Sequence, residues 1–531
     1  MSDPWRALAR AALRSERRQA LAFIALMVVT GVTTVRGYVA AYPSAASRVA
    51  LTASLGGNAG FQAWYGVARN IETVGGFTTW RLTWMLATLT AVWGLLATTR
   101  LVRGEEEAGR RELLLAGPTT ATRALTVDLA TMCAALLVFV TVFAAAMTWS
   151  GLAARSALVM AAGIGAPGLL FAAVGAFLSQ LYADHRRALA IGGAAIGASF
   201  LLRVAADGTN TLGWLRWTTP LGWAENLRPF AGSDLTPLLA LAGATAFFVI
   251  LSFVALGHRN FGDGLIALRV RSHPESSLLH GVGGFTVRLE RGVVAGWTFG
   301  IGAFAFVFGL LAVDAARFAR SQPNFDEILR RLGIASLATP QSFLGLMFAF
   351  FALPIAVFAA TQANAARTEE ATSRLDSILV LPVSRRRWLA TRLVGTIAGA
   401  VLIAVIAGLS SWLGAALRHA GVDMGAMVRA GINCLPATVF LFGLAVLCFG
   451  IAPRLTSAVS LGSVVVAYLV ELVGALAKAP EWVLDLSPFH HLAPVPAAPA
   501  NVGAAVTITV IGIALMVAGV EAFARRDLIG A

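Results

Sequence analysis

The chain has 531 residues, of which 58% are hydrophobic and only 13% charged, and its mean hydropathy is +0.76. Soluble proteins contain about 25% charged residues, and a soluble chain of this size could not bury so much apolar surface. The composition therefore excludes a soluble enzyme and predicts a polytopic membrane protein. The net charge of +14 is explained by cytoplasmic loops, which collect positive residues in membrane proteins, so we expect no nucleic-acid partner.

Apolar runs that are long enough to cross a hydrocarbon layer of about 30 Å as helices recur along the chain. They are centred near residues 28, 90, 135, 168, 197, 247, 303, 352, 402, 441, 467 and 512. The sequence does not show the alternating segments of about 10 residues that are typical of an outer-membrane barrel. We therefore predict an all-α fold with about twelve transmembrane helices.

The distribution of positive charge predicts the orientation of these spans. An even number of spans places both termini on one side, and the tails and loops of that side carry 26 Lys and Arg against 15 elsewhere. Both termini are therefore predicted to be cytoplasmic. All but one of the basic residues are Arg, a bias that indicates a high-GC bacterial genome and hence the bacterial inner (plasma) membrane.

The segment before the first span has its own pattern. Its arginines follow helical spacing between Trp5 and Arg18, and apolar residues such as Leu8 and Ala12 occupy the other face. The spacing predicts an amphipathic helix on the cytoplasmic membrane surface. The alternative is an ordinary positive flank that fixes the topology.

A charged segment occurs twice, at 103–125 and 367–389, and a shift of 264 residues aligns the two copies without gaps. Eight of the 23 aligned positions are identical, namely Arg103/Arg367, Glu105/Glu369, Glu106/Glu370, Arg110/Arg374, Leu115/Leu379, Pro118/Pro382, Arg123/Arg387 and Leu125/Leu389. A second match, at a shift of 268, pairs 214–220 with 482–488.

The repeat predicts two six-span halves. Because six is even, the halves are expected to insert with the same orientation, as a parallel repeat with pseudo-twofold symmetry. We place the first half, with the N-terminal amphipathic helix, at 1–257, a cytoplasmic linker at 258–291 and the second half at 292–531.

The repeated segment falls between the second and third span of each half, on the predicted cytoplasmic side. Residues 113–115 and 378–380 give it an apolar side, and Pro118 and Pro382 end any helix there. It is either a docking surface for a soluble partner or a structural loop with positive-inside arginines. Its recurrence favours docking, because a twofold partner needs two equivalent contacts.

The pattern from Glu105 to Pro118, Glu-x-x-x-Gly-x-x-Glu-Leu-Leu-Leu-x-x-Pro, resembles the signature of type-2 ATP-binding-cassette (ABC) exporter permeases. The second copy has Ser373 in place of Gly109 and Asp376 in place of Glu112. The fusion of two halves into one chain resembles the actinobacterial polyketide-antibiotic (tetronasin-like) exporter permeases. In that family an elbow helix precedes the first span, and the loop between spans 2 and 3 is a coupling helix that inserts into the ATPase subunit.

The resemblance implies two sets of functional residues. The set that couples the chain to the ATPase is Glu105, Glu106, Gly109, Glu112, Pro118, Glu369, Glu370, Asp376, Pro382 and Arg385. The set along a substrate path between the halves, on spans 2, 5, 8 and 11, is Trp84, Met85, Thr88, Trp93, Arg203, Phe348, Phe351, Tyr468 and Glu471. Aromatic and Met side chains suit bulky apolar ligands, but packing and lipid-facing positions use the same residue types.

Arg203 and Glu471 are ionisable residues inside apolar runs, at positions that a shift of 268 residues pairs. Because burying an unpaired charge in a membrane is costly, such residues suggest a function. A structural ion pair, or a position at the outer interface, is the alternative.

The chain offers no site for ATP hydrolysis. A phosphate-binding loop requires Gly-Lys-Ser/Thr, and the single Lys, Lys478, lies between two alanines. ATP and Mg²⁺ are therefore expected on a separate ABC ATPase subunit, in two copies, and we assign this chain no catalytic residue, cofactor or metal. Besides this subunit, the expected partners are membrane lipid and a hydrophobic small-molecule substrate.

The predicted function is export of a hydrophobic or amphipathic, antibiotic- or drug-like compound. The alternative is a proton-driven secondary transporter with twelve spans, which the scarcity of mid-membrane acids disfavours. A membrane-embedded enzyme has less support, because Asp326–Glu327 is the one acidic pair in an outer loop, and it has no counterpart in the repeat.

Overall fold

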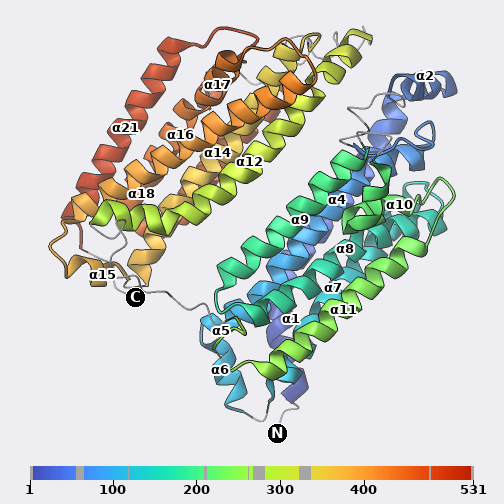
Figure 1. Ribbon diagram of the computed structural model, residues 1–531, viewed down its shortest axis with the longest axis horizontal. Coiled ribbons are helices and arrows are strands. Elements are labelled where there is room, and N and C mark those ends of the chain that lie inside the picture. The colour runs from blue at the N-terminus through green and yellow to red at the C-terminus, as the bar shows by residue number, and fades with distance from the viewer. Residues whose placement is uncertain are drawn as a thin grey trace. The chain divides into compact units, whose positions relative to one another are not determined.

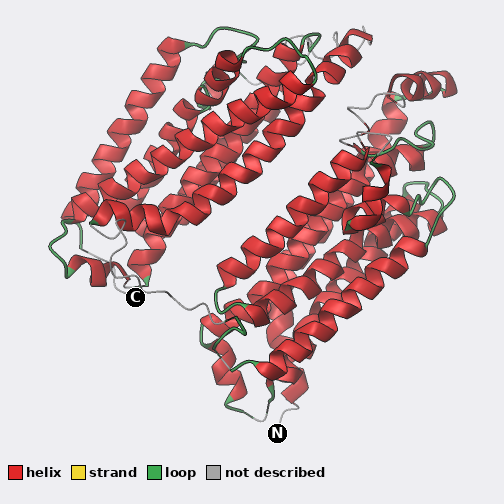
Figure 2. Cartoon of the chain, viewed as in Figure 1, coloured by secondary structure: helices red, strands yellow, loops and turns green. Residues whose placement is uncertain are grey.

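The computed structural model describes residues 4–55, 62, 65–117, 119–207, 212–260, 262–266, 281–321, 337–372, 374–476 and 480–527. Pro118, Asp326, Glu327 and Lys478 lie outside these ranges. Throughout them the chain forms helices, turns and loops and no strand (Figure 2). Within the described ranges, twelve helical spans are long and apolar enough to cross a membrane, which confirms the predicted all-α class.

The chain divides into two compact units, Met1–Arg271 and Ser272–Ala531, with six of the apolar spans in each (Figure 1). The first unit contains α1 (Pro4–Ala41), α2 (Ala45–Leu55), α4 (Val74–Thr99), the π-helical turn η1 (Arg100–Gly104), α5 (Glu105–Glu107), α6 (Arg110–Leu115), α7 (Ala121–Trp149), α8 (Ala154–Leu181), α9 (His185–Asp207), the 3₁₀ turn η2 (Gly213–Thr218), α10 (Pro220–Asn226) and α11 (Thr236–His258).

The second unit repeats this order of long helices. It contains α12 (Val282–Ser321), α14 (Pro340–Ala371), α15 (Arg374–Leu379), α16 (Arg385–Leu417), α17 (Met424–Ile432), α18 (Leu435–Ile451), the 3₁₀ turn η4 (Pro453–Leu455), α19 (Thr456–Leu476), α20 (Glu481–Leu484) and α21 (Val502–Arg525).

Hydroxyl side chains cap the N-termini of corresponding helices in the two units. Thr120 accepts a hydrogen bond from the Arg123 backbone N–H at the start of α7, and Ser384 accepts one from Arg387 at the start of α16. These caps are 264 residues apart, which is the shift of the repeat. A cap of this kind stabilises a helix by about 1 kcal/mol because it satisfies an otherwise free N–H group.

The N-terminal segment differs from the sequence expectation. It is not a separate surface helix but the beginning of α1, which runs from Pro4 to Ala41 without a break. Leu8 and Ala12 are buried in a cluster with Trp93 of α4 and Leu101 of η1. The apolar face therefore packs on neighbouring helices of its own unit, and no Gly or Pro after Pro4 interrupts the first 30 residues.

The predicted linker, 258–291, is shared between the two units. The backbone N–H groups of Leu265 and Ile266 donate hydrogen bonds of 3.0 Å to the carbonyls of Gln180 and Leu181 in the first unit. From Val282 onward the chain is already part of α12 in the second unit. The boundary at Arg271 and Ser272 lies between these two stretches.

Glycines allow α18 and α21 of the second unit to approach closely. A Cβ atom on Gly443 of α18 would lie 2.3 Å from the Gly512 carbonyl oxygen of α21, and one on Gly450 would lie 2.3 Å from that of Gly519. Both pairs are spaced by seven residues, or two helical turns, so they form one small-residue seam along which the two backbones approach. This seam fixes α21, whose end carries part of the candidate site.

Candidate functional site

The repeated charged segment lies at one end of its unit in both halves of the chain. In the first unit α4 continues through η1 into α5, and a turn at Ala108–Gly109 leads into α6. In the second unit α14 runs to Ala371 and α15 follows. Figure 1 shows α5 and α6 at the end of the first unit that holds the N-terminus, and α15 at the end of the second unit that holds the C-terminus.

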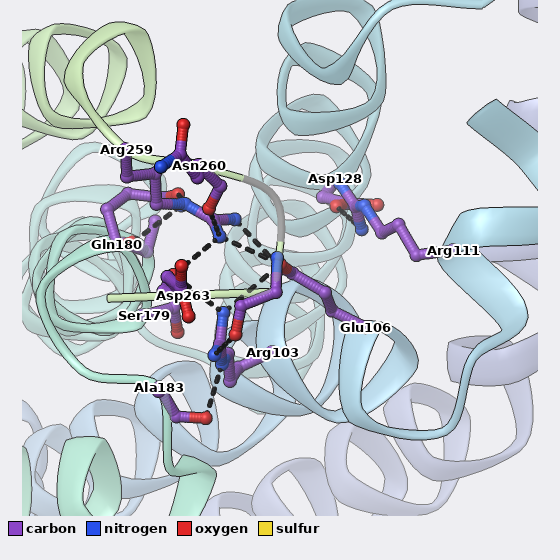
Figure 3. Close-up of polar contacts among 12 residues, drawn as sticks. Arg103, Glu106, Arg111, Asp128, Ser179, Gln180, Ala183, Arg259, Asn260 and Asp263 are labelled. Carbon is purple, nitrogen blue, oxygen red and sulfur yellow. Dashed lines mark hydrogen bonds and ion pairs between the residues drawn. The ribbon is translucent and has the colours of Figure 1, made fainter. Parts of the chain in front are cut away.

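Glu106 is the centre of a buried ionic cluster in the first unit (Figure 3). Its two carboxylate oxygens accept hydrogen bonds of 2.7 Å from Nη1 and Nη2 of Arg259, the residue that follows α11. The backbone N–H of Gly262 adds a third hydrogen bond of 2.8 Å. The carboxylate is 3% exposed, so it is not available to a partner protein at the surface.

Neighbouring groups complete this cluster. Arg103 is 2% exposed and donates hydrogen bonds of 2.7 Å to the carbonyls of Ala183 and Gly262. Arg259 Nε donates to Gln180 Oε1 at 2.6 Å. The cluster therefore ties the repeated segment to the end of α8 and to the chain after α11, and these hydrogen bonds offset the cost of burying the charges.

The second unit contains the same arrangement around Glu370. Its oxygens accept hydrogen bonds of 2.6 Å from Nη1 and Nη2 of Arg526, the residue that follows α21. The Arg526 guanidinium lies 5.3 Å from the ring centroid of Phe449 and 5.1 Å from that of Phe523. We call the pairs Glu106–Arg259 and Glu370–Arg526 the two glutamate–arginine clamps.

The sequence pointed to the glutamates of the clamps but not to the arginines. Glu106 and Glu370 align in the repeat, whereas Arg259 and Arg526 lie 153 and 156 residues further along the chain. The sequence did contain a signal for these two arginines, because each comes directly after the last span of its half.

The first glutamates of the two copies have different partners. Glu105 accepts hydrogen bonds of 2.6 and 2.7 Å from Arg110, and this contact raises the pKa of the Arg110 guanidinium above its usual value. Glu369 instead accepts from Arg392 of α16 at 2.6 Å. Arg385 donates to the Arg526 carbonyl at 2.6 Å and so supports the second clamp.

The remaining predicted coupling residues lie at the surface. Glu112, Asp376 and Pro382 are exposed, and Gly109 adopts a φ of +70° in the turn before α6. Apolar side chains are exposed beside them: Leu113 is 78% exposed and Val380 is 86% exposed. We call Leu113, Val380 and Leu381 the apolar tips. Leu375 of α15 is fully buried and anchors that helix.

The structure does not bring the predicted α4 substrate residues together. Trp84 faces α9, where its ring lies 5.8 Å from that of Phe200. Trp93 stacks on Phe23 of α1 at 4.8 Å, and Met85 packs against the cluster formed by α1 and α7. Thr88 donates a hydrogen bond of 2.7 Å to the Trp84 carbonyl within its own helix.

Arg203 is fully buried near the other end of the first unit. Its guanidinium lies 5.7 Å from the Trp84 ring centroid, and its Nη1 lies 3.6 Å from Asp207 and 3.8 Å from Glu225. Arg203 thus belongs to an ionic network inside its unit, which is the structural alternative that the sequence left open.

Three of the predicted substrate residues of the second unit, Phe348, Phe351 and Tyr468, pack in or against one hydrophobic cluster. Phe348 and Phe351 are buried in the helix core, where Phe351 meets Phe308 of α12 at 5.7 Å. Tyr468 is half-buried and contacts Phe489 at 5.8 Å. Glu471 pairs with His490 Nδ1 at 3.1 Å, a partner that the sequence did not indicate.

Comparison with known proteins places the chain in a family. A family model described as the C-terminal domain of the multidrug efflux system permease Rv1217c matches residues 279–524. The multidrug efflux system permease protein Rv1217c of Mycobacterium tuberculosis (strain ATCC 25618 / H37Rv) is 30% identical over 489 residues, which are 92% of this chain and 88% of that protein. The chain belongs to this family of multidrug efflux permeases.

Membership in this family makes the chain a transporter rather than an enzyme, and the twelve apolar spans found among its described residues make it a multi-pass membrane protein. The matches support an efflux permease but not the narrower resemblance to the tetronasin-like polyketide-antibiotic exporters. Because the similarity to this relative covers 92% of the chain, it extends into both units.

Proposed function

We propose that this permease is the membrane component of an ATP-driven ABC exporter, which moves a hydrophobic or amphipathic drug-like compound out of the cell. The observation that carries the proposal is the recurrence, in both units, of an exposed apolar tip on a segment that a buried clamp holds to the last span. Two like contacts suit two copies of one soluble subunit.

The clamps supply a physical route from the tips to the spans. A bidentate arginine–carboxylate pair fixes both distance and orientation, so a displacement of α6 or α15 acts on the ends of α11 or α21. We assign the docking contact to Leu113, Val380 and Leu381 and a positioning role to Glu106 and Glu370. ATP and Mg²⁺ would be bound by the ATPase subunits, on the cytoplasmic side of a bacterial plasma membrane where both termini lie.

The test is a double variant of the apolar tips, Leu113→Glu with Val380→Glu. The tagged permease is purified from its own cells, and the recovered ABC ATPase and the efflux of a fluorescent apolar dye are measured. We expect at least a tenfold loss of both, with unchanged thermal stability, because both side chains are exposed and a charge in an apolar contact costs several kcal/mol. The matched control is Leu486→Glu, which changes a side chain that is 70% exposed in the loop after α20.

Recovery of the wild-type permease without any ABC ATPase would contradict the proposal. A proton-driven transporter is the second candidate, because Asp207 and Glu225 place two carboxylates around the buried Arg203, and such groups serve as proton carriers in membranes. Efflux that stops with an uncoupler but continues during ATP depletion would favour that candidate.

A further inference from the structure

A long groove runs between α12 and α16 of the second unit. Its volume is about 870 Å³, and it is lined from Val287 to Phe306 on α12 and from Gly395 to Ser410 on α16. At 1.5 Å per residue, the α12 wall is about 28 Å long, which is comparable to the hydrocarbon thickness of a membrane. Apart from Glu290, Arg291, Thr298 and Ser410, the lining is apolar or glycine.

Small residues explain why a groove exists here. The two helices meet closely near one end, where a Cβ atom on Gly309 would lie 2.1 Å from the Ser411 carbonyl oxygen. Before this crossing, the α16 wall contains Gly395, Ala398 and Gly399, which leave space that larger side chains would fill. In the first unit, Phe139 and Phe143 of α7 fill the core against α1.

Glu290 makes one end of the groove acidic. It is 4% exposed, and it lines the groove two turns after the start of α12. Its Oε1 lies 3.3 Å from Arg392 Nε but accepts no hydrogen bond from the part of the protein that the structure describes. Arg392 gives its hydrogen bond of 2.6 Å to Glu369 instead.

This cluster is short of positive charge. Two carboxylates, Glu290 and Glu369, share the single guanidinium of Arg392, and one oxygen of each has no hydrogen-bond donor among the described groups. Arg291 also lines the groove, but it is exposed and forms no ion pair with Glu290 within the described residues. A buried carboxylate oxygen without a donor is costly, so a cation that enters the groove would relieve this cost.

We propose that the groove between α12 and α16 is a binding site for an amphiphilic organic cation. The apolar body of the ligand lies along Val294, Phe299 and Leu402, and its positive centre lies at Glu290. The site requires both shape and charge, because a purely apolar chain would leave the carboxylate unsatisfied. This inference concerns binding, and it is independent of the energy source that drives transport.

The test uses the full chain in phosphatidylcholine nanodiscs, with tetraphenylphosphonium as the cationic probe and triphenylphosphine oxide as its neutral counterpart. Glu290→Gln should weaken tetraphenylphosphonium binding about tenfold or more, the size expected for losing a contact with a charged group, and should change binding of the neutral probe less than twofold. Ala398→Trp, at an exposed position in the groove wall, should abolish binding of both probes.

Asp314→Asn is the matched control. Asp314 lies on the same helix, is buried and pairs with Arg418 at 2.9 Å, but it does not line the groove. Its substitution should leave the affinity for tetraphenylphosphonium unchanged. If Glu290→Gln fails to fold, as judged by thermal unfolding, Ala398→Trp tests the groove, and the preference of the wild-type protein for the charged over the neutral probe tests the charge.

Two results would overturn the proposal. One is an affinity for tetraphenylphosphonium that neither Glu290→Gln nor Ala398→Trp alters. The other is an equal affinity of the wild-type protein for the charged and the neutral probe. That result would show that the groove is an apolar surface that binds lipid acyl chains.

Discussion

Glu106 and Glu370 show what a single charged residue does in a largely apolar chain. Each is buried and accepts two hydrogen bonds from one arginine. A buried pair contributes little net stability compared with an apolar pair, but the loss of one partner leaves the other charge uncompensated, at a cost of about 3–5 kcal/mol. Compared with an apolar pair, each intact clamp therefore serves mainly to hold the repeated charged segment in place and adds little net stability.

A double-mutant cycle tests the second clamp. Glu370→Ala and Arg526→Ala should each lower the free energy of unfolding by about 3–5 kcal/mol, whereas the double variant should lose less than the sum of the two, since neither charge is left alone. Denaturant unfolding in detergent measures the free energy of unfolding of each variant. Additive losses would show that the two side chains act independently.

The control for this cycle is the pair Arg386–Glu521, which joins α16 to α21. Its two atoms are 2.7 Å apart, but its side chains are 59% and 40% exposed. The same cycle on this pair should give a coupling energy of about 0–1 kcal/mol, because water screens exposed charges.

At the scale of elements, the turn between α5 and α6 depends on one glycine. Gly109 has a φ of +70°, a conformation that costs other residues about 1–2 kcal/mol. A Cβ atom at this position would meet nothing within 4 Å, so the backbone conformation and not space accounts for the glycine. The turn sets the direction of α6 and of its exposed Leu113.

Gly109→Ala should therefore lower stability by about 1–2 kcal/mol and reduce efflux, because α6 is tilted away from its position. Gly104→Ala is the matched change: Gly104 has a φ of −62°, in a helical conformation that alanine favours. It should leave efflux unchanged. Equal effects of the two substitutions on thermal unfolding and efflux would refute this account of the turn.

At the scale of the whole molecule, the two units are versions of one six-span design. The capping residues Thr120 and Ser384, and the two clamps, occupy corresponding places. Every one of these contacts lies within a single unit. Each unit therefore positions its own coupling segment.

The predicted orientation can be tested by cysteine labelling. Leu113→Cys and Val380→Cys should both react with a membrane-impermeant maleimide only after the cells are opened, because both segments are expected on the cytoplasmic side. Leu486→Cys should react in intact cells. The existing Cys133, Cys434 and Cys448 lie within apolar spans, and replacing them with alanine removes background. Labelling of Leu113→Cys and Val380→Cys from opposite sides would contradict the parallel repeat.

The amino-acid sequence by itself determined the helical class, the number of spans and the duplicated segment, because hydropathy and repeat spacing are local properties of the chain. It did not determine that Trp5–Arg18 continues into the first span, since the burial of Leu8 depends on Trp93 and Leu101, far along the chain. It did not determine the packing neighbours of Met85 and Trp93 either, which both lie against α1.

Only the tertiary structure decided which charges meet. Arg259 and Arg526 reach glutamates that precede them by 153 and 156 residues, and Glu290 and Glu369 converge on one arginine. Such contacts depend on how the helices pack, because a charge in an apolar environment must find a partner wherever the fold supplies one.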